Sequence, residues 1–461
     1  MTMTRVDLIT LVPVFLIFSA SAPGESIKAG VAKIDITPPP GLYLLGSGEV
    51  KATGTLDPLF ARALVLETGA KRIALVTLDL CRVFQAPLLD QLRERVRAHS
   101  GINHLIVTAS HTHSGPIIPI RESLPLDEMT GWQKRAMEQT AAAVDEARGR
   151  TEPVHIGAGY GVSYIGHNRR ILNPDGTVTM FFANPTRIPT SPVDPTVAVV
   201  RMDSIGGNPI AVLVNYACHP VVIMGKLAQY SADFPGAMCN IVEKGLDNRT
   251  LCMFLQGGAG DIDTYYTGVA PEQDPPAKLR WTADRIGAEA LRVARSIRTA
   301  EQADSSIDIV EDRLPFRWRW GAGQFEQVMR DINPPALLPY YVPDVKPILD
   351  VPTQTVLINK RLAVMTVPGE PFVELQMDWR ARCPVTDCLF LGYANGFFSY
   401  FPTIKAAVEG GHGGALWTRV EPGAGERMVD NAVIRTYEML GRLSHKPEPP
   451  RELRKKQRAD R

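Results

Sequence analysis

The sequence has few cysteines, almost no net charge and no long apolar segment beyond its N-terminal region. Six cysteines among 461 residues are too few for a disulfide scaffold, although Cys383 and Cys388 are close enough in sequence to be bridged if the protein is exported. The formal net charge of +1 gives no electrostatic reason to expect nucleic acid as a partner. No later segment approaches the roughly 20 apolar residues that span a bilayer. These absences leave a globular protein whose substrate must be inferred from its polar motifs.

Residues 1–25 have the order of features that is typical of a signal peptide. Arg5 precedes an apolar run over residues 8–18, and small residues follow at positions 19–22. Asp7 weakens the basic start, so an uncleaved N-terminus is the alternative. The pattern predicts a protein that is secreted or held in the periplasm or cell envelope.

Apolar and amphipathic segments alternate along residues 26–445, which we expect to form one catalytic domain. Helical spacing of apolar residues predicts helices, and β-branched runs predict strands. The expected helices cover residues 88–99, 129–148 and 279–297, and paired strands are expected around the turn at 68–71 and within 355–370. This order predicts an α/β fold, in which helices cover a layered mixed sheet and the active site lies at the strand ends.

Two segments depart from this alternation. Residues 304–351 are rich in proline, and we expect them to be irregular. Residues 446–461 are highly charged, and we expect them to form a disordered tail.

Several apolar segments end in polar or glycine-rich loops. These loops carry His111, His219, Asp261 and Glu370. Because the functional groups of an α/β fold collect where strand ends converge, we expect these side chains to lie together.

Two of only nine histidines lie in the segment SHTHSGP at residues 110–116. On an extended segment His111 and His113 would point to the same side, since strand side chains alternate. Such a pair can bind a metal or be divided between metal and substrate, but loops also carry His-x-His without a metal. Together with His219 and Glu370, the pair favours a catalytic zinc with an open position for water, although other divalent ions accept the same ligands.

Eight motifs occur in a fixed order along the chain. They are GVAKIDITPP (30–39), SHTHSGP (110–116), NR (168–169), CHP (218–220), SADFPG (231–236), GAGD (258–261), PGE (368–370) and NGFFSYFPT (395–403). In this series the chain resembles the neutral, non-lysosomal ceramidase family of zinc amidases, which cleave the amide bond of ceramide. The resemblance implies that zinc is bound by His111, His219, Glu370 and Tyr400.

The same resemblance implies that His113 and Arg169 hold the substrate and stabilise the developing oxyanion. Without it, Arg169 would be interpreted as an ordinary surface arginine beside Arg170. Where ceramidases have a serine shortly after Gly-Asp, this chain has Asp263, two residues after Asp261. If that serine is an obligatory nucleophile in the family, this chain cannot use the same covalent step, whereas a mechanism with zinc-activated water survives the change.

Asp261 and Asp263 have two interpretations. Either carboxylate can act as a general base or orient a ligand histidine, or it can have only a loop or helix-cap role. A later active-site tyrosine of the family has no clear counterpart, and His412 lies in that region.

The leading hypothesis is a zinc-dependent hydrolase that cleaves the amide bond of ceramide or another N-acyl lipid with metal-activated water. Its partners would be a lipid or small-molecule substrate and, for substrate access, the membrane surface. One alternative is a zinc hydrolase of esters, lactones or non-lipid amides. Another is a non-catalytic binding protein of the cell envelope that retains the metal for stability.

Overall fold

The computed structural model describes residues 26–122, 129–300 and 305–443. The predicted signal peptide and the predicted charged tail therefore lie outside the described residues. None of the helices in the described ranges is both long and apolar enough to cross a membrane.

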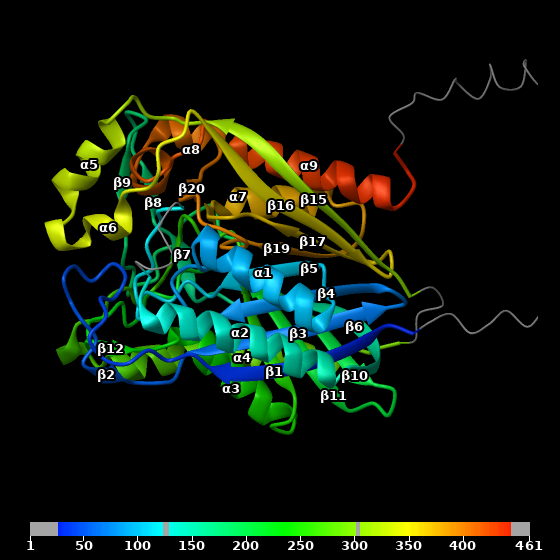
Figure 1. Ribbon diagram of the computed structural model, residues 1–461. Helices are drawn as coiled ribbons and strands as arrows, with labels where there is room; N and C mark the ends of the chain where they lie inside the picture. The colour runs from blue at the N-terminus through cyan, green and yellow to red at the C-terminus, as the bar shows by residue number, and fades with distance from the viewer. Residues whose placement is uncertain (1–25, 123–128, 301–304, 444–461) are drawn as a thin grey trace, which may run out of the picture.

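An eight-stranded mixed sheet forms the centre of the fold (Figure 1). Its order is β13-β11-β10-β6-β1-β3-β4-β5. The pairs β4–β5 and β11–β13 are parallel, and the other neighbours are antiparallel. The strands are β1 (Lys28–Asp35), β3 (Phe60–Thr68), β4 (Lys71–Leu78), β5 (His104–Ala109), β6 (Glu152–Val162), β10 (Thr196–Ser204), β11 (Pro209–Tyr216) and β13 (Leu251–Gln256).

A smaller four-stranded sheet packs against the large one. It has the order β15-β16-β17-β19, formed by β15 (Ile307–Arg317), β16 (Ile348–Ile358), β17 (Leu362–Thr366) and β19 (Asp387–Leu391). A buried apolar cluster joins the two sheets, with Leu64 and Leu213 on one side and Val364 and Leu391 on the other.

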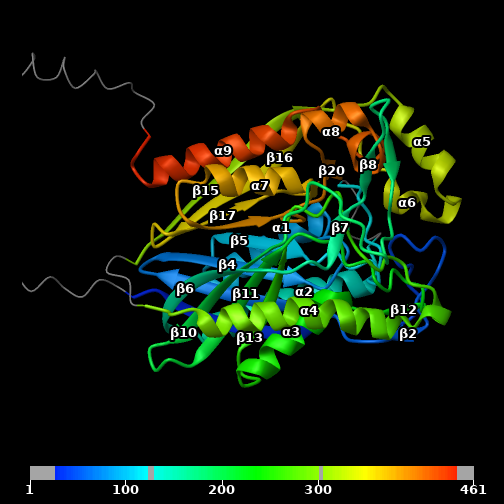
Figure 2. The ribbon, with the colours of Figure 1, turned by 180° about the vertical axis from the view of Figure 1, so that it is seen from behind.

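Helices cover the outer face of each sheet, so the fold has four layers (Figures 1 and 2). The large sheet is covered by α1 (Ala86–Ser100), α2 (Gly131–Gly149), α3 (Asp233–Leu246) and α4 (Pro275–Ser296). The small sheet is covered by α7 (Val373–Arg382) and α9 (Ala424–Met439). Side-chain alternation in the strands produces this arrangement: in β3, Ala63 and Val65 face the helices, whereas Leu64 and Leu66 face the second sheet.

The predicted helices are present because their amphipathic spacing is reinforced by signals at their ends. Thr130 and Gln133 form a reciprocal capping box at the start of α2. Gly101, with a φ of 62°, ends α1 in the left-handed conformation. The expectation for residues 304–351 was wrong in part, because Ile307–Arg317 forms the long edge strand β15.

The short elements collect at the end of the molecule opposite residues 26 and 443 (Figures 1 and 2). They are β2 (Gly54–Thr55), β7 (Gly166–Asn168), β8 (Arg170–Leu172), β9 (Val178–Met180), β12 (Gln229–Tyr230), β14 (Ile262–Thr264), β18 (Glu370–Pro371), β20 (Tyr400–Phe401), α5 (Gln324–Ile332), α6 (Leu338–Tyr341), α8 (Ile404–Glu409), the 3₁₀ turns Pro271–Gln273 and Pro335–Leu337, and the π-helix His412–Leu416. Loops that lead to these elements carry most of the polar motifs.

Candidate metal centre and active site

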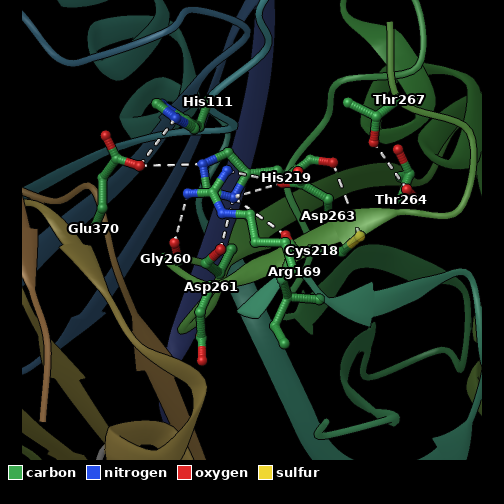
Figure 3. Close-up of polar contacts among 12 residues, drawn as sticks. His111, Arg169, Cys218, His219, Gly260, Asp261, Asp263, Thr264, Thr267 and Glu370 are labelled. Atoms are coloured by element: carbon green, nitrogen blue, oxygen red, sulfur yellow. Dashed lines mark hydrogen bonds and ion pairs between the residues drawn. The ribbon is translucent and has the colours of Figure 1, made fainter. Parts of the chain in front are cut away.

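Segments that follow strands of both sheets bring the predicted residues together (Figure 3). His111 follows β5 and His219 follows β11, whereas Glu370 begins β18 after the small sheet's β17. Parallel pairing of β18 with β20 places Glu370 beside Tyr400. His219 forms a β-bridge with Asp263 of β14. The predicted convergence of strand ends is therefore present.

Three imidazoles and one carboxylate surround a single point. The Glu370 Oε2 atom lies 3.1 Å from His219 Nε2 and 3.5 Å from His111 Nε2. His113 Nε2 lies 3.2 Å from His111 Nε2, and one nitrogen from each of the three histidines falls within 4.8 Å of the others. This spacing suits ligands that share one metal ion.

Backbone carbonyl groups fix the orientation of two of these rings. His111 Nδ1 lies 2.5 Å from the Cys81 carbonyl oxygen, and His219 Nδ1 lies 2.6 Å from that of Ala259. Because a carbonyl oxygen only accepts, each Nδ1 must donate, and each Nε2 then presents a lone pair toward Glu370. His113 Nδ1 is buried without a partner, so His113 is not oriented in this way. The donor set therefore fits a divalent metal such as zinc, held by His111 and His219.

The backbone at the histidine pair differs from the extended form expected. The strand β5 ends at Ala109, and His111 has a φ of 68° in the left-handed region. The N–H group of His111 donates to the carbonyl oxygen of Leu80, which draws the chain toward the β4–α1 loop. His111 and His113 still contact each other, but through this turn rather than through strand alternation.

Arg169 is buried at the centre of the site and is not a surface arginine. Its Nη1 donates to Asp263 Oδ1 at 3.0 Å, and its Nη2 donates to the Gly260 carbonyl at 2.7 Å and to Tyr400 Oη at 2.9 Å. Burial alone would lower the pKa of Arg169, but Asp263 and Tyr400 raise it above its usual value. The guanidinium is therefore a permanent cation between two predicted site residues. Burial raises the pKa of Tyr400 well above 10.

The two aspartates have different surroundings. Asp261 accepts hydrogen bonds from the Val373 N–H group at 2.8 Å and from Asn168 Nδ2 at 2.7 Å, and burial raises its pKa to about 6. Asp263 Oδ1 also lies 3.7 Å from His219 Nδ1, and its Oδ2 is buried without a hydrogen-bond partner. Asp261 thus ties α7 to β7, whereas Asp263 contacts the site itself.

A pocket of about 380 Å³ opens over these groups. It is lined by Leu45, Gly46, Arg82, His111, His113, Ile120, Arg169, Phe182, Val221, Met224, Asp263, Thr267, Tyr341, Glu370, Phe397, Ser399, Tyr400, His412 and Trp417. Sequence patterns gave no signal for Arg82, Phe182, Tyr341 or Trp417, because these side chains come from distant parts of the chain.

His412 lies in the pocket wall on a π-helix that follows two glycines with φ near 80°. Its ring centre is 5.6 Å from that of Tyr400 and 5.9 Å from that of Trp417. Burial lowers its pKa to about 3, so the ring is neutral at physiological pH. His412, which lies in the sequence region of the family's later active-site tyrosine, is therefore part of the site.

A comparison with known families decides the classification. The sequence model of the neutral/alkaline non-lysosomal ceramidase family, N-terminal part, matches residues 27–273, more than half of the chain. The chain belongs to this ceramidase family. The neutral ceramidase of Pseudomonas aeruginosa is 23% identical over 342 residues, which cover 70% of this chain. The chain spans about half the length of that relative.

Solved ceramidase structures share the fold. The crystal structure of the neutral ceramidase from Pseudomonas aeruginosa matches with a TM-score of 0.72 and 19% identity, over 92% of this chain and 76% of that one. A structure described as ceramidase complexed with C2 matches with a TM-score of 0.73 and 19% identity, over 92% and 77% of the two chains. The predicted α/β fold and the family resemblance are confirmed.

Most predicted site residues of this ceramidase-family chain line one pocket. Six of the eight do so, and they are His111, His113, Arg169, Asp263, Glu370 and Tyr400. His219 is not among the lining residues but contacts Glu370, and Asp261 accepts a hydrogen bond from the first residue of α7. The roles of these residues remain predictions.

Proposed function

We propose that this protein is a metal-dependent hydrolase of the amide bond of an N-acyl lipid, ceramide or a related compound. The metal would be zinc, held by His111, His219, Glu370 and Tyr400. Membership of the ceramidase family supports the reaction class. The observation that carries the metal proposal is the pair of imidazoles whose Nδ1 atoms meet carbonyl oxygens and whose Nε2 atoms approach one carboxylate.

Several polar groups of the pocket suit amide hydrolysis, which adds water across the C–N bond and releases a carboxylic acid and an amine. When bound, zinc supplies a Lewis acid and makes hydroxide available near neutral pH. Arg169 and His113 supply N–H donors beside the site, where they would stabilise the negative charge that develops on the carbonyl oxygen. Preorganised donors of this kind lower the energy of the transition state because they need no rearrangement during the reaction.

Asp263 would act as a positioning residue. Its contact with Arg169 at 3.0 Å orients an oxyanion donor, and its carboxylate lies 3.7 Å from His219 Nδ1, whose hydrogen goes to the Ala259 carbonyl oxygen. This role suits a chain that has aspartate where ceramidases have serine, since water and not a side chain then attacks the carbonyl carbon. Asp261, which ties α7 to β7, would support the site only through the fold.

The pocket wall supports a lipid substrate. Phe182, Tyr341, Phe397 and Trp417 give it an aromatic lining that suits an acyl chain. Leu172 in β8 and Val408 in α8 are exposed apolar side chains on the surface. An ion pair between Arg170 and Glu409 joins these two elements. We propose that this surface contacts lipid during substrate uptake.

The remaining predictions concern the whole chain. We propose that residues 1–25 are a signal peptide that directs export, and that residues 26–445 act as one catalytic domain. Determining the N-terminal residue and the mass of the protein recovered outside the cytoplasm tests this proposal. A retained residue 1, or recovery only from the cytoplasm, would contradict it.

The first experiment measures metal content together with release of fatty acid from a fluorescent ceramide. His111→Ala should lose both the bound zinc and the activity. His104→Ala is the matched control, because His104 begins the same strand, β5, but is exposed and pairs with Glu311. Retention of metal and activity by His111→Ala would refute the proposed site, whereas bound zinc without turnover of N-acyl lipids would favour esters or other amides.

A further inference from the structure

Arg82, a cation in the pocket wall, has no carboxylate partner among the residues that the structure describes. Among the residues that the structure describes, five arginines are buried, and they are Arg62, Arg82, Arg169, Arg170 and Arg419. Three of them form ion pairs with Asp79, Asp263 and Glu409, respectively. Arg82 and Arg419 have no carboxylate within ion-pair distance in the described ranges, and of these two only Arg82 lines the pocket.

The contacts of Arg82 leave part of its guanidinium free. Nη1 donates to the carbonyl oxygens of Ile118 at 2.8 Å and Tyr340 at 3.4 Å. The guanidinium carbon lies 4.5 Å from the ring centre of Phe397 and 5.7 Å from that of Tyr341. Nε is buried without a partner, and Nη2 makes no hydrogen bond within the described chain. Nε and Nη2 together form one edge of the guanidinium fork, which matches the two oxygens of a carboxylate.

With a metal bound, the charges of the pocket favour an anionic ligand. The cations Arg82 and Arg169 balance the carboxylates of Asp263 and Glu370, but only Arg169 is paired directly, with Asp263. A divalent metal would therefore give the pocket a net positive charge. A buried cation without a partner is costly, so a ligand that supplies the missing negative charge gains more binding free energy than a neutral ligand.

We propose that Arg82 is an anion-binding subsite of this pocket, and that the preferred substrates are N-acyl amides with a carboxylate in the head group. This assignment rests on the proposed amide hydrolysis and makes Arg82 a specificity-determining residue for it. Arg82 lies next to Cys81, whose carbonyl oxygen orients His111, so one loop places both the metal ligand and the head-group contact.

Two substrates that have the same acyl chain but differ in the charge of the head group test whether the pocket recognises that charge. N-dodecanoylglycine ends in a carboxylate, and N-dodecanoylethanolamine ends in a hydroxymethyl group. The ratio of their kcat/KM values should favour the glycine conjugate at least tenfold in the zinc-loaded protein. Arg82→Met should reduce this ratio by a factor of about 10 to 100, the range for a hydrogen bond to a charged group, and Arg82→Lys should give an intermediate ratio.

Arg201→Met is the control. Arg201 lies in β10, donates to Asp203 and to the Ala294 carbonyl oxygen, and does not line the pocket, so its replacement should leave the ratio unchanged. Circular dichroism of each variant verifies the fold, and Arg82→Lys serves as the test variant if Arg82→Met does not fold. A wild-type ratio near one, or the same ratio in wild type and the Arg82 variants, would overturn the assignment.

Binding distinguishes failure of this assignment from failure of the proposed reaction. Isothermal titration of metal-depleted protein with N-dodecanoylglycine should give a Kd at least tenfold higher in Arg82→Met than in wild type or Arg201→Met. This result without turnover of either amide would support the anion subsite while refuting amide hydrolysis. Equal Kd values in wild type and Arg82→Met would overturn the subsite, whatever the turnover.

Discussion

Replacement of Asp263 by asparagine tests whether the buried pair with Arg169 organises the site. The side chains of Asp263 and Arg169 are 1% and 5% exposed and lie 3.0 Å apart. The Asp263→Asn variant keeps the shape of the side chain but leaves the Arg169 cation without its carboxylate. Breaking a buried pair in this way costs about 3 to 5 kcal/mol of the free energy of unfolding.

The same change should lower kcat by a factor of about 100, because a misplaced guanidinium no longer stabilises the oxyanion. Urea denaturation, followed by tryptophan fluorescence in metal-depleted protein, measures the stability. The double variant Arg169→Met/Asp263→Asn removes the orphan charge, so it should recover a substantial part of the lost stability while remaining inactive.

Two results would refute this reasoning. One is a loss of less than 1 kcal/mol in Asp263→Asn, which would mean that the carboxylate is not needed to hold the cation. The other is a double variant whose loss equals the sum of the two single losses, since independent sites are additive and coupled sites are not.

Three further predictions concern stability and membrane contact. Burial raises the pKa of Asp233 to about 7. Between pH about 4 and about 7 the folded state therefore binds more protons than the unfolded state, so the free energy of unfolding should fall as pH rises. Asp233→Asn should flatten this slope in urea denaturation, and an unchanged slope would contradict the prediction. A Cβ at Gly30 would lie 2.1 Å from the Ala147 carbonyl oxygen, so Gly30→Ala should lower the free energy of unfolding by about 1 to 3 kcal/mol, and an unaltered denaturation midpoint would count against this close approach. Val408 is 84% exposed on α8, so Val408→Glu should reduce co-sedimentation with phosphatidylcholine vesicles but not hydrolysis of a short-chain amide in solution; equal sedimentation of the two proteins would argue against lipid contact there.

The sequence predicted the elements that have strong apolar periodicity. The helices α1, α2 and α4 were expected within a few residues of their observed bounds, since one face of each is apolar and their ends carry capping or turn residues. The strand β15 was missed because most of its side chains are partly or fully exposed, which leaves little contrast between its two faces. Pro315 also argued against a strand, but it lies in an edge strand, where proline is tolerated.

Only those residues of the candidate site that lie in short sequence motifs could be predicted. His111, His219 and Glu370 follow apolar strands, so their convergence could be expected from topology. The left-handed backbone of His111 was not visible in the sequence, because it depends on a hydrogen bond to Leu80. The subsite at Arg82 was hidden for a similar reason, since the groups that surround it come from residues 118, 340, 341 and 397.

The proposed metal ligands are divided between the two sheets, and this division determines when during synthesis the metal site can be completed. His111 and His219 follow strands of the large sheet, whereas Glu370 and Tyr400 follow strands of the small one. A growing polypeptide that has emerged only as far as β17 carries both histidines but no carboxylate to complete the cluster. Tight binding of the ion would therefore require that the small sheet, which is synthesised later, has packed against the large sheet. The bound ion would then stabilise the interface between the two sheets.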